Sequence, residues 1–336
     1  MRPFMPAIKL IQVIHSHSKN YHLSSDKLSS APMAFNWQTF KTRTLTAILF
    51  AAVMLVGLLW NQWSFLILFS IIHFGCWWEY FNLLEKIHNT SFHRYTRFGF
   101  MLIGFVIMLW FCGPAYKINN YGVKENFSFP VSVAGFVLLG MGIFQKSKIN
   151  LKAFGTAGLG LLYISLSWGL MMDIRNETVY DDHLNFYFEK GRYITTGLVY
   201  CIWINDTMAY IVGSLIGKTP LSPISPKKTW EGTLGGIVLC IILVGVISLF
   251  VTFSSPFSFL PYWIHYGGSW YSWVIIAAIA AIFSTFGDLL ESKLKRMAGV
   301  KDSGNFMPGH GGFLDRFDSM LLATPAVWLY VHLILN

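Results

Sequence analysis

The chain has 336 residues, of which 54% are hydrophobic, 17% aromatic and only 12% charged, and its formal net charge is +9. A soluble domain carries about 25% charged residues, so a chain of this composition could not cover a water-facing surface with polar groups. The same composition excludes intrinsic disorder, which is poor in aromatic residues and rich in charge. It predicts an integral membrane protein.

Residues 1–33 contain Ser and His residues but no apolar span, and they are basic and nearly free of acids. We expect them to form an N-terminal extension, either disordered or not part of the natural chain, which would then start at Met33. A targeting segment is the alternative interpretation. Residues 34–336 are predicted to form one transmembrane domain.

Apolar segments follow one another along this domain, and each is close to the roughly 20 residues that a membrane-spanning helix needs. They cover 44–60, 63–84, 99–116, 129–145, 153–172, 194–216, 232–253, 270–290 and 319–335. The pattern predicts an all-α, polytopic membrane protein with about nine transmembrane helices.

The distribution of basic residues gives a second test of this topology. If the N-terminus is cytoplasmic, 20 of the 25 Lys and Arg residues fall in the inner segments and 5 in the outer ones. Cytoplasmic loops of membrane proteins carry such an excess of Lys and Arg. The N-terminus is therefore predicted inside and the C-terminus outside.

Three acids lie within the predicted spans, namely Glu79, Asp206 and Asp288. An acid at the centre of a membrane helix costs roughly 2.5–3.5 kcal/mol on insertion scales, so it faces a partner or a cavity. Each acid therefore has two interpretations: it forms a hydrogen bond to a neighbouring helix, or it belongs to a functional site. Asp206 is the deepest of the three.

The inner segment 217–232 is rich in proline, which prevents a helix, so it is predicted to be a stiff extended loop. Its candidate ligand-binding residues are Lys218, Ser225, Lys227, Lys228 and Thr229. Ammonium and hydroxyl groups presented in this way suit a polyphosphate. A basic patch on anionic lipid headgroups is the alternative.

The next inner segment places acids at the ends of two membrane helices. Asp288, Glu291, Ser292 and Lys295 are spaced i, i+3, i+4 and i+7, so they share one helix face. Asp315 and Asp318 are i, i+3 neighbours at the start of the last span. Carboxylates bind Mg²⁺, which binds phosphate oxygens in turn, so the sequence pairs groups that hold metal with groups that hold phosphate. The glycines of 308–312 allow backbone N–H groups to approach a ligand.

These motifs resemble those of a known family. The run SKLKRMAGVKDSGNFMPGHGGFLDRFD, from Ser292 to Asp318, is similar to the signature of the CDP-diacylglycerol synthases, also called phosphatidate cytidylyltransferases. The run SPKKTWEG, from Ser225 to Gly232, resembles the second landmark of that family. The resemblance covers roughly residues 36–336, and only the apolar residues Met208 and Met307 depart from its pattern.

The resemblance implies a reaction in which phosphatidate and CTP give CDP-diacylglycerol and pyrophosphate, with Mg²⁺ and the option of a second cation. It implies no nucleic-acid partner, and a homodimer. The implied catalytic residues are Asp288, Asp315, Asp318, Lys295 and Asp302, of which Asp288, Asp315 and Asp318 are the metal ligands. The implied substrate-binding residues are Lys218, Ser225, Lys227, Lys228, Thr229, Ser292, Arg296, Lys301, His310, Arg316 and Asp206. For His310, a role in ordering the loop is the alternative.

Other functions remain open at this stage. A cytidylyltransferase or kinase that acts on another membrane lipid, such as an isoprenoid ether phosphate, would use similar groups. A transporter would need inverted repeats and acids near the midplane, whereas this chain gathers its polar residues on one side. The expected location is the bacterial cytoplasmic (inner) membrane.

Overall fold

The computed structural model describes residues 37–145, 150–181, 186–253, 269–306 and 311–335. The chain divides into two units, Met1–Lys41 and Thr42–Asn336, and the second contains nearly all of the helical residues. The predicted extension, residues 1–33, lies outside the described residues.

The described residues are mostly helical. The helices are α2 (Trp37–Leu59), α3 (Gln62–His88), α4 (Arg94–Trp110), α5 (Val123–Ile143), α6 (Leu151–Gly160), the π-helix η2 (Leu161–Leu166), α7 (Ser167–Asn176), α8 (Lys190–Ile216), α9 (Trp230–Phe253), α11 (Trp270–Met297), α12 (Leu314–Tyr330) and the π-helix η3 (Val331–Leu335). The strands are β1 (Lys117–Ile118), β2 (Tyr121–Gly122), β3 (Val179–Asp181), β4 (Phe186–Phe188), β5 (Pro220–Ser222) and β6 (Ser225–Thr229). Each antiparallel pair of strands, β1–β2, β3–β4 and β5–β6, is a short hairpin. The all-α prediction is confirmed.

Every predicted span overlaps a helix or a continuous run of helices among the described residues, although the span 99–116 extends beyond the end of α4 at Trp110. Seven of these are long and apolar enough to cross a membrane. The predicted ends are less accurate, because α3 continues to His88 and α11 to Met297. Apolarity marks the bilayer, whereas a helix ends where its capping groups are satisfied. Asn89 ends α3 in this way, with a left-handed φ of 51° and its N–H on the carbonyl of Glu85.

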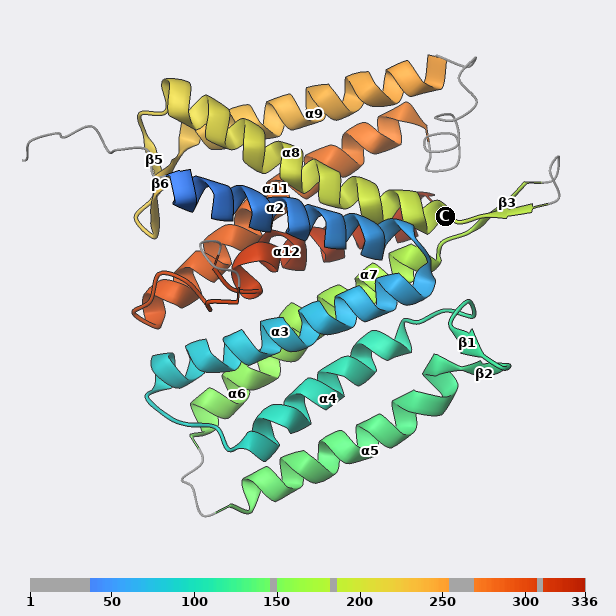
Figure 1. Ribbon diagram of the computed structural model, residues 1–336, viewed down its shortest axis with the longest axis vertical. Coiled ribbons are helices and arrows are strands. Elements are labelled where there is room, and N and C mark those ends of the chain that lie inside the picture. The colour runs from blue at the N-terminus through green and yellow to red at the C-terminus, as the bar shows by residue number, and fades with distance from the viewer. Residues whose placement is uncertain (1–36, 146–149, 182–185, 254–268, 307–310, 336) are drawn as a thin grey trace, which may run out of the picture. The chain divides into compact units, whose positions relative to one another are not determined.

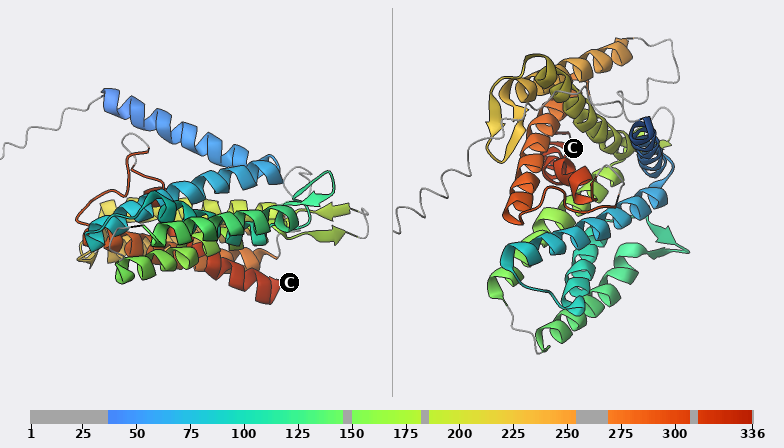
Figure 2. Two further views of the ribbon diagram at one scale, coloured as in Figure 1. Left: turned by 90° about the horizontal axis from the view of Figure 1, so that it is seen from below. Right: turned by 60° about the vertical axis from the view of Figure 1, so that its left-hand side comes forward.

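The helices of the second unit lie side by side, and successive helices run in opposite directions (Figure 1). As a result, the β5–β6 hairpin, the end of α11 and the start of α12 lie at one end of the bundle. The β1–β2 and β3–β4 hairpins lie at the opposite end (Figures 1 and 2). The two polar segments that the sequence placed on one side of the membrane are therefore at the same end of the bundle.

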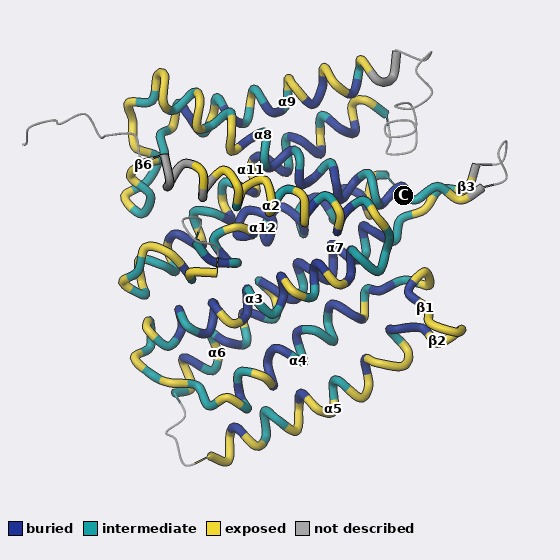
Figure 3. Tube along the Cα trace, viewed as in Figure 1, coloured by how far each residue is buried: buried dark blue, intermediate teal, exposed yellow. Residues whose placement is uncertain are grey.

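The core of the bundle lies where α3, α7 and α12 meet. Trp168 of α7 packs between Phe69 of α3 and Phe317 of α12, with ring centroids 5.1 and 5.9 Å apart. All three rings are buried. By contrast, α5 and α9 carry many exposed residues (Figure 3), and those residues are largely apolar, as expected of helices that face lipid.

The predicted orientation can be tested by labelling with a membrane-impermeant maleimide, since the four native cysteines are all buried. Tyr121→Cys, in the exposed β1–β2 hairpin, is expected to react in intact cells. Lys227→Cys, in the exposed β6 strand, is expected to react only after permeabilisation. The reverse pattern would contradict the predicted topology, and the wild-type chain gives the background.

Candidate active site

The site is built where α11 and α12 cross. A Cβ atom added to Gly287 of α11 would lie 2.4 Å from the carbonyl oxygen of Asp318, so the two backbones meet there without an intervening side chain. Small residues allow such close contact between membrane helices. The crossing brings Asp288 and Asp318 together, and these two carboxylates interact electrostatically. Asp318 is only 7% exposed, and one of its oxygens accepts the N–H of Ser319 at 2.7 Å.

The β5–β6 hairpin reaches this crossing through one lysine. Lys228 Nζ of β6 forms an ion pair with Asp288 Oδ2. Ser292 Oγ, one helical turn further along α11, donates to Asp288 Oδ1 at 3.2 Å. Asp206 of α8 interacts electrostatically with both Lys228 and Asp288. The structure thus brings the proline-rich segment and the acidic helix face into contact.

A second lysine, Lys295 of α11, lies between two carboxylates. Its ammonium forms an ion pair with Glu291, one turn earlier in the helix, and another with Asp315 Oδ1 at 2.6 Å. Glu291 is 0% exposed, so its negative charge depends on this lysine. The spacing of the α11 residues does place them on one face, as the sequence predicted.

Asp315 organises the connection between α11 and α12. Its Oδ2 atom accepts the N–H and the hydroxyl of Ser303 and the N–H of Gly312, each at 2.9 Å. With Lys295 on Oδ1, both carboxylate oxygens are engaged. Eight residues joined by these contacts are called the acid–base cluster below: Lys228, Asp288, Glu291, Ser292, Lys295, Ser303, Asp315 and Asp318.

Other residues of the polar segments serve the local fold. Arg296 Nε donates to the carbonyl of Ile224 at 3.3 Å and so holds the hairpin turn against α11. Thr229 Oγ1 accepts the N–H of Gly232 at 3.1 Å, at the start of α9. Ser225 pairs with Ser222 across the hairpin. The extended loop predicted for this segment therefore folds as a hairpin.

The remaining predicted residues fall into two groups, those that are exposed and one that the structure does not describe. The exposed ones are Lys218, Lys227, Lys301, Asp302 and Arg316. The backbone N–H of Lys218 donates to Glu231 at 3.2 Å, which closes the base of the hairpin. His310 lies outside the described residues.

Two residues of the cluster and one beside it were not among the predicted site residues. Glu291 was placed on the right helix face without a role, and Ser303 was not considered. Glu79 of α3 was noted as an acid in a membrane span, but its partners are far away in the sequence. The signal that could have identified it is the cost of a carboxylate in an apolar helix.

The fit of a divalent cation can be judged from the donor set. The described residues contain no group of three or more His, Cys, Asp or Glu side chains that could hold a metal ion together. Mg²⁺ is commonly bound by one or two carboxylates with substrate phosphates completing its shell. Asp288 and Asp318 meet this requirement, since Asp318 Oδ2 accepts no hydrogen bond from the described residues.

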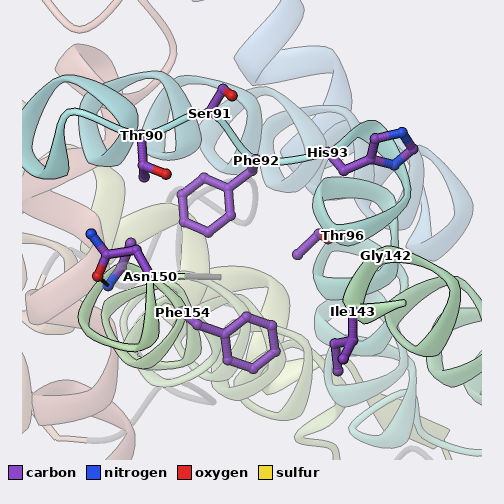
Figure 4. A pocket seen from close by; sticks show the side chains of 10 residues that line it. Thr90, Ser91, Phe92, His93, Thr96, Gly142, Ile143, Asn150 and Phe154 are labelled. Atoms are coloured by element: carbon purple, nitrogen blue, oxygen red, sulfur yellow. Dashed lines mark hydrogen bonds between the residues drawn. The ribbon is translucent and has the colours of Figure 1, made fainter. Parts of the chain in front are cut away.

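A separate pocket lies between the α3–α4 connection, α4, the end of α5 and the start of α6 (Figure 4). It is lined by Thr90, Ser91, Phe92, His93, Thr96, Gly142, Ile143, Asn150, Ala153 and Phe154. This lining contains no carboxylate and no lysine or arginine, so it lacks the groups that bind a metal–polyphosphate. Such groups are present in the acid–base cluster.

Comparison with known proteins gives consistent matches. The model of the cytidylyltransferase family matches residues 41–334. The phosphatidate cytidylyltransferase of Staphylococcus saprophyticus is 30% identical over 85% of this chain and 96% of its own length. That of Bacillus subtilis is 30% identical over 87% of this chain and 98% of its own length. A third, from Synechocystis, is 43% identical over 44% of this chain and 46% of its own. The family match includes both segments of the cluster.

Proposed function

Because the chain belongs to the cytidylyltransferase family, we propose that it transfers a cytidylyl group from CTP to phosphatidate in a membrane. Two relatives named phosphatidate cytidylyltransferase match 85% and 87% of the chain. The observation that carries the proposal is the acid–base cluster at one end of the membrane helices. A lipid can bring its phosphate headgroup there while its acyl chains stay among apolar residues.

The chemistry asks little of the protein beyond positioning and charge. The phosphate monoester of the lipid has a second pKa near ~6, so it is largely a dianion at neutral pH. One of its oxygens forms a bond to the α-phosphorus of CTP, and the bond from that phosphorus to the β-phosphate oxygen breaks. Pyrophosphate leaves, and no general base is needed. The enzyme must align the groups in line and neutralise several negative charges.

The lysines of the cluster suit this task. Lys228 of β6 pairs with Asp288, and Lys295 of α11 pairs with Glu291 and Asp315. Each lysine is paired with a carboxylate, so a bound triphosphate would displace that carboxylate from the ammonium. The exposed Lys218, Lys227 and Lys301 extend the positive surface toward incoming CTP.

A Mg²⁺ ion would be held by Asp288 and Asp318, with phosphate oxygens of the substrate completing its shell. Asp315, the third ligand that the resemblance implied, is instead engaged by Lys295, Ser303 and Gly312. When bound, the cation would neutralise charge on the phosphate oxygens.

For location, we propose a bacterial cytoplasmic membrane with the cluster on the cytoplasmic side, where CTP is present. The matching relatives are bacterial proteins.

The proposal is tested with the purified full-length chain in lipid vesicles that contain phosphatidate, given Mg²⁺ and CTP labelled at the α- or the γ-phosphate. The α-label is expected in CDP-diacylglycerol, with release of pyrophosphate. Appearance of the γ-label in lipid would instead identify a kinase. Product formation only with an isoprenoid ether phosphate would identify that lipid, and not phosphatidate, as the acceptor. The absence of product with every lipid phosphate would refute the proposed function.

A further inference from the structure

Glu79 is a buried carboxylate that the proposed reaction does not use. It lies on α3, is 5% exposed, and has no Lys, Arg or His as an ion-pair partner among the described residues. A carboxylate in an apolar helix bundle is costly unless its oxygens are hydrogen-bonded. Its hydrogen-bond partners therefore indicate what it does.

Among the described residues, the three donors to Glu79 come from the segment that joins α11 to α12 and from the first residue of α12. Its Oε1 atom accepts the N–H of Phe313 at 2.9 Å, and its Oε2 atom accepts the N–H of Leu314 at 2.9 Å. Since α12 begins at Leu314 and Phe313 provides no side-chain cap of its own, the carboxylate from α3 satisfies N–H groups that the helix start leaves free. Its negative charge also suits that end of the helix dipole.

The third donor connects Glu79 to the acid–base cluster. Ser303 Oγ lies 2.7 Å from Glu79 Oε2 and 2.9 Å from Asp315 Oδ2. A hydroxyl has one proton, so Ser303 can donate to only one of the two carboxylates at a time. The Ser303 N–H donates to Asp315 as well. Glu79, Ser303 and Asp315 thus form one chain of contacts that ends at Lys295.

The backbone between α11 and α12 packs closely against the Glu79 carboxylate. A Cβ atom added to Gly312 would lie 2.2 Å from both Glu79 oxygens. The backbone at Gly312 therefore rests directly on the carboxylate, while its N–H donates to Asp315. Glu79 therefore contacts the same two residues, Ser303 and Gly312, that donate to Asp315.

We propose that Glu79 is a positioning residue: through Ser303 and the start of α12, it fixes the orientation of Asp315. The predicted effect of Glu79 on turnover rests on the proposed function, whereas its predicted effect on the order of residues 311–318 does not. Groups that support metal ligands typically change activity by about 10–100-fold when they are removed. Glu79→Gln replaces one acceptor oxygen by an amide that cannot accept from these donors.

A matched control is available on the same helix. Glu85 of α3 accepts the N–H of Phe92 at 2.6 Å and pairs with Arg97, so it orders the α3–α4 connection. Glu79→Gln is expected to lower kcat by about 10–100-fold with little change in KM for CTP. Glu85→Gln should keep a kcat close to that of the wild type, and Glu79→Asp should recover part of the loss. Equal losses in the two Gln variants would overturn the proposal.

Hydrogen–deuterium exchange of the full chain supplies a readout without turnover. Glu79→Gln is expected to speed exchange in peptides that cover 311–318, whereas Glu85→Gln should speed it near 89–97 only. Ser303→Ala keeps both N–H bonds to Glu79, so exchange at Leu314 should stay slow while kcat falls. Unchanged exchange at 311–318 in Glu79→Gln would refute the positioning role. If the wild type makes no product, the proposed function is refuted, but the exchange rates at 311–318 still decide the role of Glu79.

Discussion

Replacement of Asp315 by asparagine is expected to lower kcat by about 10³-fold, the upper range for loss of one group that stabilises a transition state. The carboxylate accepts from Lys295 on one oxygen and from Ser303 and Gly312 on the other. Asparagine has only one acceptor oxygen, so in either orientation of the amide its NH₂ group would face a hydrogen-bond donor. Steady-state kinetics with phosphatidate and CTP measures the effect.

The control for this variant is a carboxylate that contacts α12 near the other end of that helix. Asp173 Oδ2 of α7 accepts the Nε1–H of Trp328 of α12 at 2.7 Å. Asp173→Asn makes the same chemical change at another carboxylate that contacts α12, and it should leave kcat within a few-fold of the wild-type value. A kcat for Asp315→Asn above one tenth of the wild-type value would remove Asp315 from the catalytic residues.

The Lys295→Met variant is expected to lose both turnover and stability. Lys295 is the ion-pair partner of Glu291 and of Asp315, and its removal leaves the fully buried Glu291 without a counter-charge. Breaking a buried pair in this way costs about 3–5 kcal/mol. Turnover should fall by about 10²–10³-fold, because an ammonium that neutralises phosphate charge is lost.

A second substitution separates these two effects. In the double variant Lys295→Met with Glu291→Gln, the buried charge is gone, so thermal stability should recover most of the loss while turnover stays low. Lys293→Met, an exposed lysine two residues earlier on the same helix, is the control and should behave like the wild type. Recovery of turnover in the double variant would show that Lys295 serves stability alone.

Much of the fold follows from apolarity and charge, which act over short stretches of sequence. The spans were predicted because about 20 apolar residues in a row have few other structures available to them. Their ends were predicted less well, since Asn89 and the start of α12 are set by capping contacts. The β5–β6 hairpin was predicted only as extended chain, because its strand pairing depends on a turn with no clear signal.

The site was predictable only to the extent that it depends on helical periodicity. The shared face of Asp288, Ser292 and Lys295 follows from their spacing. Their partners do not, since the contact between Lys228 and Asp288 joins residues 60 positions apart. The contact between Glu79 and Leu314 joins residues 235 positions apart. Such pairings are created by helix packing, and nothing near residue 79 in the sequence indicates them.

The pairing of Lys228 with Asp288 and of Lys295 with Asp315 has a consequence for the reaction cycle. In the proposed reaction, an incoming nucleotide would compete with the carboxylates for each ammonium. The net gain in binding would then be the difference in free energy between the two partners of each lysine. The same competition would work against retention of pyrophosphate, because each carboxylate could pair with its lysine again. The cluster would thus contain its own displacing anions, which would favour rapid release of a highly charged product over tight binding of a highly charged substrate.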